Sequence, residues 1–271
     1  MLRHLIILLA LAAPVSAEPL QIVTDIGPVQ SLVARVWGDV PSVLAGPDTD
    51  PHDFQFRPSQ VRALATADIL FLAGPDLSPW LADEARSVNP AIIVRPLSPD
   101  QTGESHPWLD PRNAAGWLTA IAAELAALDP QGAALYRQRA SDAQTELAAL
   151  ERDLDAMLEP ARHYRIVVAH DAYGPLASRF GLTIAAAVAD SHGRAPGAAH
   201  LARLRAQVVG GSVDCIFAEP GEGQDHARLL TGGSGIPVGA LDPLGRDLPP
   251  GPGQYTALMR ALAAAIAGCA G

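Results

Sequence analysis

Apolar and polar residues alternate along this chain in a pattern typical of strands and helices that follow one another. Short apolar runs, rich in valine, isoleucine and leucine and bounded by glycine, proline or aspartate, are typical of buried strands. Between them lie stretches with apolar residues every three or four positions, which predict helices. The expected strands are 20–25, 42–45, 68–73, 91–94, 166–169, 182–188, 215–218 and 237–241. Such alternation predicts an α/β fold with parallel sheets and helices on their faces.

The longest helical pattern lies in the middle of the chain, at 131–159. Its apolar positions form one stripe: Ala140, Ala143, Leu147, Leu150, Leu154 and Met157. At 1.5 Å per residue this helix would be roughly 40 Å long, more than one small lobe needs. The other expected helices are 28–37, 58–67, 77–88, 112–128, 175–180, 198–209, 224–230 and 255–267. We therefore expect a (βα)4 lobe at 18–130, a long linking helix at 131–160 and a second (βα)4 lobe at 161–271.

The first seventeen residues have the pattern of a secretory signal peptide. A short basic segment, Met1–His4, precedes an apolar run at 5–13, and Val15–Ala17 has the small-x-small form of a cleavage site. The apolar run is shorter than the ~20 residues that span a bilayer. We expect cleavage near Ala17 and a soluble product exported to a bacterial periplasm.

Composition narrows the class of protein. The 271 residues carry a net charge of −10, and no basic cluster suits nucleic acid. All basic residues are arginine, so lysine Schiff-base chemistry is excluded. Cys215 and Cys269 are the only cysteines. In an oxidising compartment they suit a disulfide, and two free buried thiols are the alternative.

Three histidines occupy comparable places beside the expected strands. His170 ends a strand, and His52 and His106 lie in loops next to proline or an acid. Open α/β sheets bind ligands at the carboxyl ends of their strands. We therefore expect these imidazoles to converge on one metal ion in the cleft between the lobes. His192 and His200 flank a loop with glycine and proline, and we interpret them as solvated.

The chain resembles the metal-binding substrate-binding proteins of bacterial ABC importers, of the zinc-importer type. The segments that carry the resemblance are Asp50–Phe54, Arg57–Ser59, His106–Leu109, His170–Gly174, Pro196–Ala198, Cys215–Pro220 and Leu241–Gly245. The resemblance implies two (βα)4 lobes joined by one long helix. It also implies that His52, His106 and His170 are the metal ligands and that Cys215 and Cys269 form a disulfide.

The fourth ligand implied by the resemblance is Asp242. A water molecule and Glu219 are alternatives, and Asp242 next to Pro243 also suits a turn. Three imidazoles and one carboxylate suit tetrahedral Zn²⁺, whereas manganese prefers more oxygen ligands. Zn²⁺ is therefore the expected transported ligand, with manganese or iron as the alternative. Many family members carry a histidine-rich loop before the second ligand, but 97–105 is short and has no histidine.

The expected function is capture of Zn²⁺ in the periplasm and delivery to an ABC permease in the inner membrane. We expect a monomer without enzyme activity, and the missing loop leaves room for a separate periplasmic zinc donor protein. One alternative is a zinc hydrolase with a three-histidine site, in which Asp171 or Glu219 would be the general base. The sequence has no His-Glu-x-x-His motif to support it. Another alternative is a metal-stabilised adhesion or scaffold protein, which would unfold on metal removal.

Overall fold

A computed structural model describes residues 19–99, 103–194, 196–220 and 224–270. The predicted signal peptide and its cleavage site lie outside the described residues. Within the described ranges, no helix is both long and apolar enough to cross a membrane.

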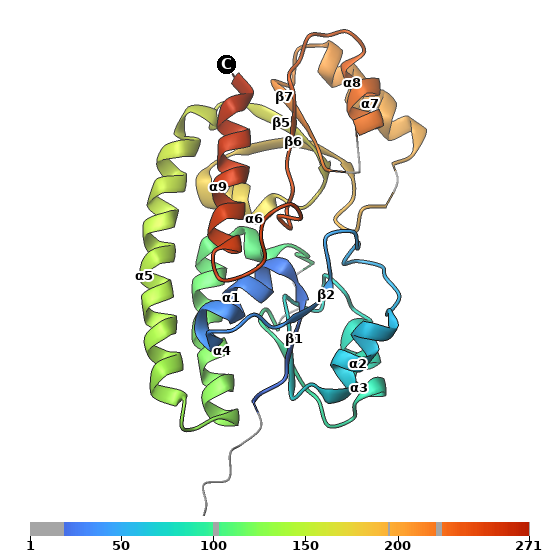
Figure 1. Cartoon of the computed structure of the whole chain (residues 1–271). Coiled ribbons are helices and arrows are strands. Elements are labelled where there is room, and N and C mark those ends of the chain that lie inside the picture. Colours follow the sequence, from blue (N-terminus) through green and yellow to red (C-terminus); the bar gives the residue numbers. More distant parts are fainter. Residues whose placement is uncertain (1–18, 100–102, 195, 221–223, 271) are drawn as a thin grey trace, which may run out of the picture.

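Two four-stranded parallel sheets with helices on their faces make up the fold (Figure 1). The elements of the N-terminal half are β1 (Ile22–Ile26), α1 (Gly27–Trp37), β2 (Ser42–Ala45), α2 (Pro58–Thr66), β3 (Ile69–Leu72), α3 (Leu81–Val88), β4 (Ile93–Pro96), the 3-10 turn η1 (Pro107–Leu109) and α4 (Pro111–Leu128). After the linking helix α5 (Ala133–Leu158) and the turn η2 (Glu159–Ala161), the C-terminal half contains β5 (Arg165–His170), α6 (Gly174–Phe180), β6 (Thr183–Ala189), α7 (Ala198–Val209), β7 (Cys215–Ala218), α8 (Gln224–Thr231), β8 (Val238–Ala240), α9 (Gln254–Ala267) and η3 (Gly268–Ala270). The predicted α/β fold with two parallel sheets and one long helix is confirmed.

The largest difference from the expected elements is at the start of α3. This helix begins at Leu81, four residues later than the pattern predicts. Pro79 lies just before it, and a proline disfavours helical backbone at the residue that precedes it, here Ser78. The chain between β3 and α3 therefore forms turns. Leu77 in these turns contacts the side chain of His52.

The two sheets have the same strand order. It is β2-β1-β3-β4 in one sheet and β6-β5-β7-β8 in the other. In each sheet the chain crosses from one side of the first strand to the other, which creates a topological switch point. Ligands of open α/β sheets bind at such points, outside the carboxyl ends of the strands. In the C-terminal sheet this point lies between β5, which ends at His170, and β7.

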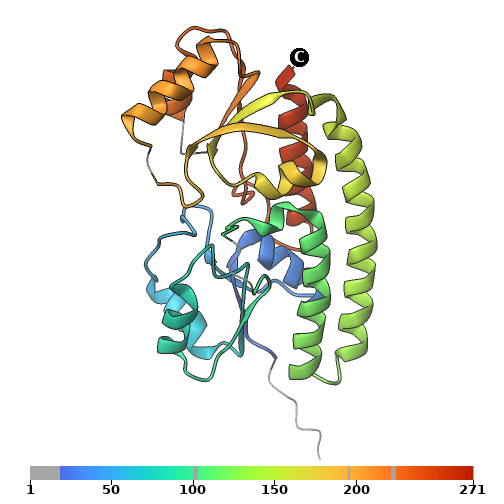
Figure 2. The ribbon, with the colours of Figure 1, turned by 180° about the vertical axis from the view of Figure 1, so that it is seen from behind.

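The long helix α5 runs beside both sheets, with α4 and α9 next to it (Figures 1 and 2). Its buried side chains are Tyr136, Ala140, Ala143, Leu147, Leu150, Leu154 and Leu158. The predicted stripe is therefore observed, except that Met157 is only partly buried and Leu158 takes the last buried position.

One continuous hydrophobic core links the two halves of the chain. Phe71 from β3, Leu147 from α5 and Phe217 from β7 belong to the same buried cluster. Polar contacts reinforce it: the Trp108 indole N–H donates to the carbonyl of Pro243 at 2.8 Å, and the Tyr255 hydroxyl donates to the carbonyl of Trp108 at 2.7 Å. Because the two halves share packed side chains, this arrangement favours limited movement between them.

The disulfide implied by the resemblance is confirmed. Cys215 in β7 is bonded to Cys269, directly after α9, with 6.2 Å between the two Cα atoms. Cys215 is fully buried, and its neighbours in β7 pair with β5 and β8. The bond therefore ties the last helix to an inner strand of the C-terminal sheet.

Candidate metal centre

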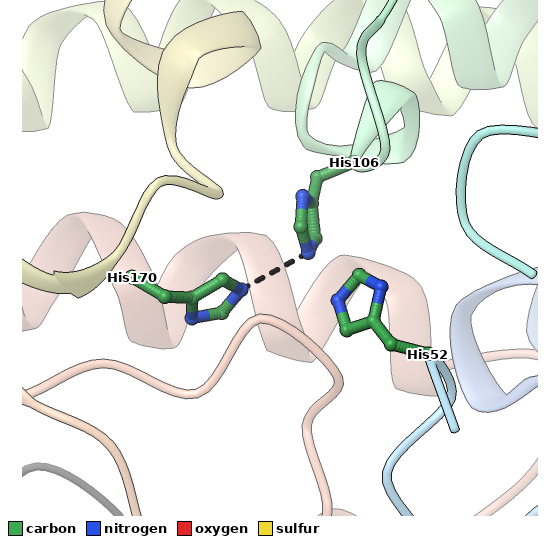
Figure 3. A group of neighbouring side chains, drawn as sticks. All are labelled: His52, His106 and His170. Atoms are coloured by element: carbon green, nitrogen blue, oxygen red, sulfur yellow. Dashed lines mark hydrogen bonds between the residues drawn. The ribbon is translucent and has the colours of Figure 1, made fainter. Parts of the chain in front are cut away.

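Three histidines from separate parts of the chain meet between the two sheets (Figure 3). His52 comes from the loop after β2, His106 lies just before η1, and His170 is the last residue of β5. One ring nitrogen from each imidazole lies within 4.8 Å of the other two. The structure thus brings together the three residues that were singled out from the sequence.

The backbone around each histidine is fixed in a different way. His170 belongs to the parallel ladder and pairs with Ala189 of β6. The His106 backbone N–H donates to Oε1 of Glu104 at 2.8 Å, and the following Trp108 is fully buried. The His52 backbone N–H donates to Oδ1 of Asp50 at 2.9 Å. His106 and His170 are buried, at 2% and 8% exposure, whereas His52 is half-buried on its loop.

Hydrogen bonds orient two of the three rings. His52 Nδ1 lies 3.2 Å from the carbonyl oxygen of Leu77, which can only accept, so Nδ1 is the protonated nitrogen. His170 Nδ1 lies 2.6 Å from Oε1 of Glu219 and donates to this carboxylate. In both rings this leaves Nε2 as the nitrogen that can bind a metal. Partners of this kind fix the tautomer and the ring orientation in metal sites.

Glu219 therefore holds the His170 ring through a hydrogen bond to Nδ1. It directly follows β7, is 5% exposed, and its Oε1 also accepts from the hydroxyl of Tyr173 at 3.1 Å. The sequence suggested Glu219 only as an alternative fourth ligand or as a general base. Its position one residue after a strand was the available signal, but the pairing of β7 with β5 cannot be obtained from the hydrophobic pattern.

The distance between two ring nitrogens is compatible with a bound metal ion. Nε2 of His106 and Nε2 of His170 are 3.1 Å apart. His170 Nδ1 is used by Glu219, so Nε2 is the nitrogen of this ring that is free to bind a metal. In a tetrahedral zinc site with bonds of 2.0–2.1 Å, neighbouring ligand nitrogens are about 3.3 Å apart. The spacing therefore suits a small metal ion.

The environment of His106 and His52 favours the uncharged form of these two imidazoles. Burial lowers the pKa of His106 well below 6.5, and the nearby His170, His52 and His192 lower it further. Burial also lowers the pKa of His52, although Asp50 opposes the shift. Neutral imidazole is the form that binds metal, so these shifts favour ligation at neutral and mildly acidic pH.

These pKa shifts predict a shallow pH dependence of metal affinity just below pH 6.5. Protons compete with the metal for an imidazole only once the pH falls below its pKa, and the pKa values of His52 and His106 are lowered. We expect log Kd for zinc to change by fewer than three units per pH unit immediately below pH 6.5, and more steeply at lower pH. Competition titrations with a fluorescent chelator between pH 5 and 8 measure this slope. A slope of three beginning at 6.5 would contradict the lowered pKa values.

The structure does not bring Asp242 into the group of three histidines. Its Oδ1 accepts the backbone N–H of Leu244 at 3.0 Å, and its Oδ2 accepts that of Arg246 at 2.5 Å. The turn-forming role considered for the Asp242–Pro243 pair is therefore observed, and the carboxylate lies at the base of a segment that borders the centre.

A fourth histidine, His192, lies next to His52 at the edge of the three-histidine centre. The centre of its ring is 5.5 Å from that of His52, although His192 is exposed. The carboxylate of Asp190 accepts the backbone N–H groups of His192 and Arg194, at 3.0 and 3.1 Å, and so fixes this loop. His192 had been interpreted as a solvated residue; its place beside His52 follows from the neighbouring positions of β6 and β5, which the sequence does not give.

The space enclosed at the centre is very small. A pocket of about 20 Å³ is lined by Asp50, Pro51, His52, His106, His170, Gly193, Glu219, Pro243, Leu244 and Arg246. This volume holds little more than one particle the size of a water molecule. It therefore suits a single ion.

Comparison with known proteins agrees with this geometry. The family model of ZnuA, the periplasmic component A of zinc-uptake complexes, matches residues 22–269. A high-affinity zinc uptake system protein ZnuA from Paracoccus denitrificans (strain Pd 1222) is 34% identical over 308 aligned residues, which cover 96% of this chain and 94% of that protein. A crystal structure of ZnuA has a TM-score of 0.81 at 25% identity, covering 92% of this chain and 98% of that one. The substrate-binding protein FpvC from Pseudomonas aeruginosa, in complex with Mn²⁺, has a TM-score of 0.80 at 25% identity, covering 92% and 97%. The chain belongs to the ZnuA family of periplasmic zinc-uptake components.

Proposed function

We propose that this protein captures Zn²⁺ with high affinity in the periplasm and delivers it to an ABC-type permease. The observation that carries the proposal is the set of three imidazoles whose ring nitrogens lie within 4.8 Å of one another around a pocket for one ion. His52, His106 and His170 hold the metal as cargo. The same proposal includes export through the signal peptide 1–17, a monomeric state and a periplasmic zinc donor. It also includes lobe boundaries near residues 130 and 160.

The donor atoms favour zinc over manganese. All three ligands are neutral nitrogen donors, which suit Zn²⁺, whereas Mn²⁺ prefers carboxylate and water oxygens. Glu219 is the nearest buried carboxylate behind the ligands, and its Oε1 already accepts hydrogen bonds from His170 and Tyr173. The Mn²⁺ complex of FpvC keeps manganese as the alternative cargo, and the competition experiment described below decides between the two metals.

Metal content is the first test of the proposal. Protein exported to a periplasm is purified without added metal and analysed by elemental mass spectrometry, and the bound metal is then challenged with excess manganese. We expect one zinc per chain that resists replacement. Bound manganese, or no retained metal, would contradict the assignment of zinc.

Delivery is a separate part of the proposal and needs a separate test. Zinc-loaded protein is added to vesicles that contain the cognate permease and ATP, and uptake of radioactive zinc is followed. We expect uptake to require both the loaded protein and ATP. Equal uptake from free zinc would contradict a delivery role.

Asp242 is our proposed fourth ligand, with a water molecule as the alternative. Each carboxylate oxygen has a second lone pair, so metal binding is compatible with the two backbone hydrogen bonds that hold the turn. For Asp242→Asn we expect a loss of zinc affinity of about tenfold or more, by analogy with the 10–100-fold effects of altered metal-site partners. An unchanged Kd in a chelator competition assay would assign the fourth position to water.

Removing the carboxylate behind His170 should weaken binding without removing a ligand. Glu219→Ala leaves the His170 ring free to rotate or to change tautomer, and we expect a loss of zinc affinity of about 10–100-fold. Glu219→Gln keeps an oxygen that can accept from His170 Nδ1 and should lose less. Tyr173→Phe is the matched control, because it removes the other partner of Oε1 and leaves the imidazole bond in place. Equal effects of all three changes would contradict the orienting role.

A further inference from the structure

The ring of His106 differs from the other two rings of the centre in its hydrogen bonding. Nδ1 of His52 bonds to the carbonyl of Leu77, and Nδ1 of His170 bonds to the carboxylate of Glu219. Nδ1 of His106 is buried and has no hydrogen bond within the described part of the chain. Because the residue is almost fully buried, solvent does not supply the missing bond. One of the three proposed ligands therefore lacks the kind of partner that orients the other two.

Nδ1 of His106 is the nitrogen that needs a partner once metal is bound. Nε2 of this ring faces Nε2 of His170 at 3.1 Å and is therefore the nitrogen on the side of the proposed metal. A neutral imidazole that binds a metal through Nε2 carries its proton on Nδ1, which is then a hydrogen-bond donor. A buried donor without an acceptor is costly. Metal binding at His106 is therefore strongest when an acceptor comes within reach of Nδ1.

An acceptor lies close by, two residues earlier in the chain. Oε1 of Glu104 is 3.9 Å from Nδ1 of His106. The same oxygen already accepts the backbone N–H of His106 at 2.8 Å, so the carboxylate is held on this side of the residue. Hydrogen bonds of this kind are about 2.7–3.2 Å long, so a shift of ~1 Å closes the gap. The Glu104 side chain is 36% exposed, and its rotatable bonds allow a movement of this size.

The carboxylate of Glu104 also lies beside the segment that follows His170. A Cβ atom added to Gly174, at the start of α6, would be 3.3 Å from Oε2 of Glu104. Asp171, directly after His170, is near enough to interact with Glu104 through its charge. Glu104 therefore lies between the loop of His106 and the turn after β5, next to two of the proposed ligands.

We propose that Glu104 is the positioning residue of His106. When zinc binds to Nε2, Nδ1 donates to Oε1 of Glu104, just as Nδ1 of His170 donates to Glu219. Such a bond fixes the tautomer and the orientation of a metal-binding ring. Each of the three rings then has a partner on Nδ1: two carboxylates and one backbone carbonyl. This inference rests on the proposed function, because it requires His106 to be a metal ligand.

The first test observes the Nδ1 proton itself. The mature full-length chain, with nitrogen-15 in its histidines and zinc bound, is studied by NMR. We expect an Nδ1–H signal of His106 that is protected from exchange with water. Glu104→Gln replaces the charged acceptor with a neutral one and should shift this signal most, whereas Glu219→Gln should shift that of His170 most, which assigns both signals. Absence of the His106 signal, or a signal that Glu104→Gln leaves in place, would overturn the proposal.

Zinc affinity then measures what the bond contributes. Glu104→Ala should weaken zinc binding by about 10–100-fold, the usual effect of removing such a partner. Glu104→Gln should recover most of this loss, because its amide oxygen can still accept from Nδ1. Competition with a chelator of known zinc affinity measures each Kd, and circular dichroism checks that each variant is folded.

Two control variants separate the hydrogen bond from other effects. Asp171→Asn removes one negative charge near Glu104 without removing an acceptor of His106, and it should change zinc affinity by less than about fivefold. Ser105→Ala removes the neighbouring hydroxyl, which is also buried without a partner in the described residues, and should leave the Nδ1 signal in place.

Failure of this inference can be told apart from failure of the proposed function. If the unmodified protein retains no zinc, the proposed function itself fails. If it binds zinc and a folded Glu104→Ala variant binds equally well, only the role of Glu104 is overturned. The same holds if Glu104→Gln recovers none of the affinity, or if Asp171→Asn weakens binding as much as Glu104→Ala does.

Discussion

His170→Ala is expected to lower the affinity for zinc by about 10²–10³-fold. Structural zinc sites with four ligands bind with about 10–16 kcal/mol, so the loss of one ligand removes roughly 3–4 kcal/mol. His170 is the most firmly placed of the three proposed ligands, because it belongs to a central strand and its ring is held by Glu219. Competition with a chelator of known zinc affinity measures the change.

Two further variants separate ligation from folding. His170→Gln keeps an amide that can donate to Glu219 but lacks the imidazole, so it should lose zinc affinity with less effect on stability. His163→Ala removes an exposed histidine outside the centre and should bind zinc normally. Thermal melting of the metal-free proteins shows whether the fold survives. Normal zinc affinity in a folded His170→Ala variant would refute the site.

Replacement of both cysteines by alanine is expected to lower the free energy of unfolding by about 4 kcal/mol. The disulfide joins residues 54 positions apart, and a chain-entropy estimate for a loop of this length gives about 4 kcal/mol. The cost should appear as a lower urea midpoint with a similar or slightly larger slope, because the unfolded chain without the crosslink is less compact. Urea unfolding followed by circular dichroism measures it.

Reduction of the unmodified protein provides the matched control for the cysteine variant. With excess reductant, its urea midpoint should fall to nearly that of the double variant, and the double variant itself should not respond to reductant. Equal stability of the oxidised protein and the double variant would contradict a stabilising disulfide. Zinc affinity should change little in either case, because the bond lies at the far end of β7 from Glu219.

The order of strands and helices could be predicted from the sequence because the core is built from short apolar runs with clear boundaries. The run at 166–169 and the stripe of α5 are examples, and both are buried as expected. The start of α3 was less predictable, because the pattern of apolar residues continues into the turns around Pro79. Periodicity reports which side chains face the core, but it does not report where a proline prevents a helix from beginning.

The candidate site was predictable only in part. His52, His106 and His170 could be selected because each lies beside a strand or proline, within segments that resemble a known family. The positions of Glu219 and His192 next to the centre could not be predicted, because they depend on β7 and β6 lying on either side of β5. Strand order is set by crossovers between elements distant in sequence, and hydrophobic periodicity contains no information about it.

If the three histidines hold the metal as proposed, their unequal burial sets the direction in which the metal leaves. The backbones of His106 and His170 are attached to the packed core, through the buried Trp108 and the β5 ladder. His52 is half-buried on a loop, so its movement loses less packing than movement of the two buried histidines. Dissociation should therefore begin with the His52 bond and pass through a two-histidine intermediate. A receptor that pulls the loop at 46–57 aside would speed metal release while the rest of the protein stays unchanged.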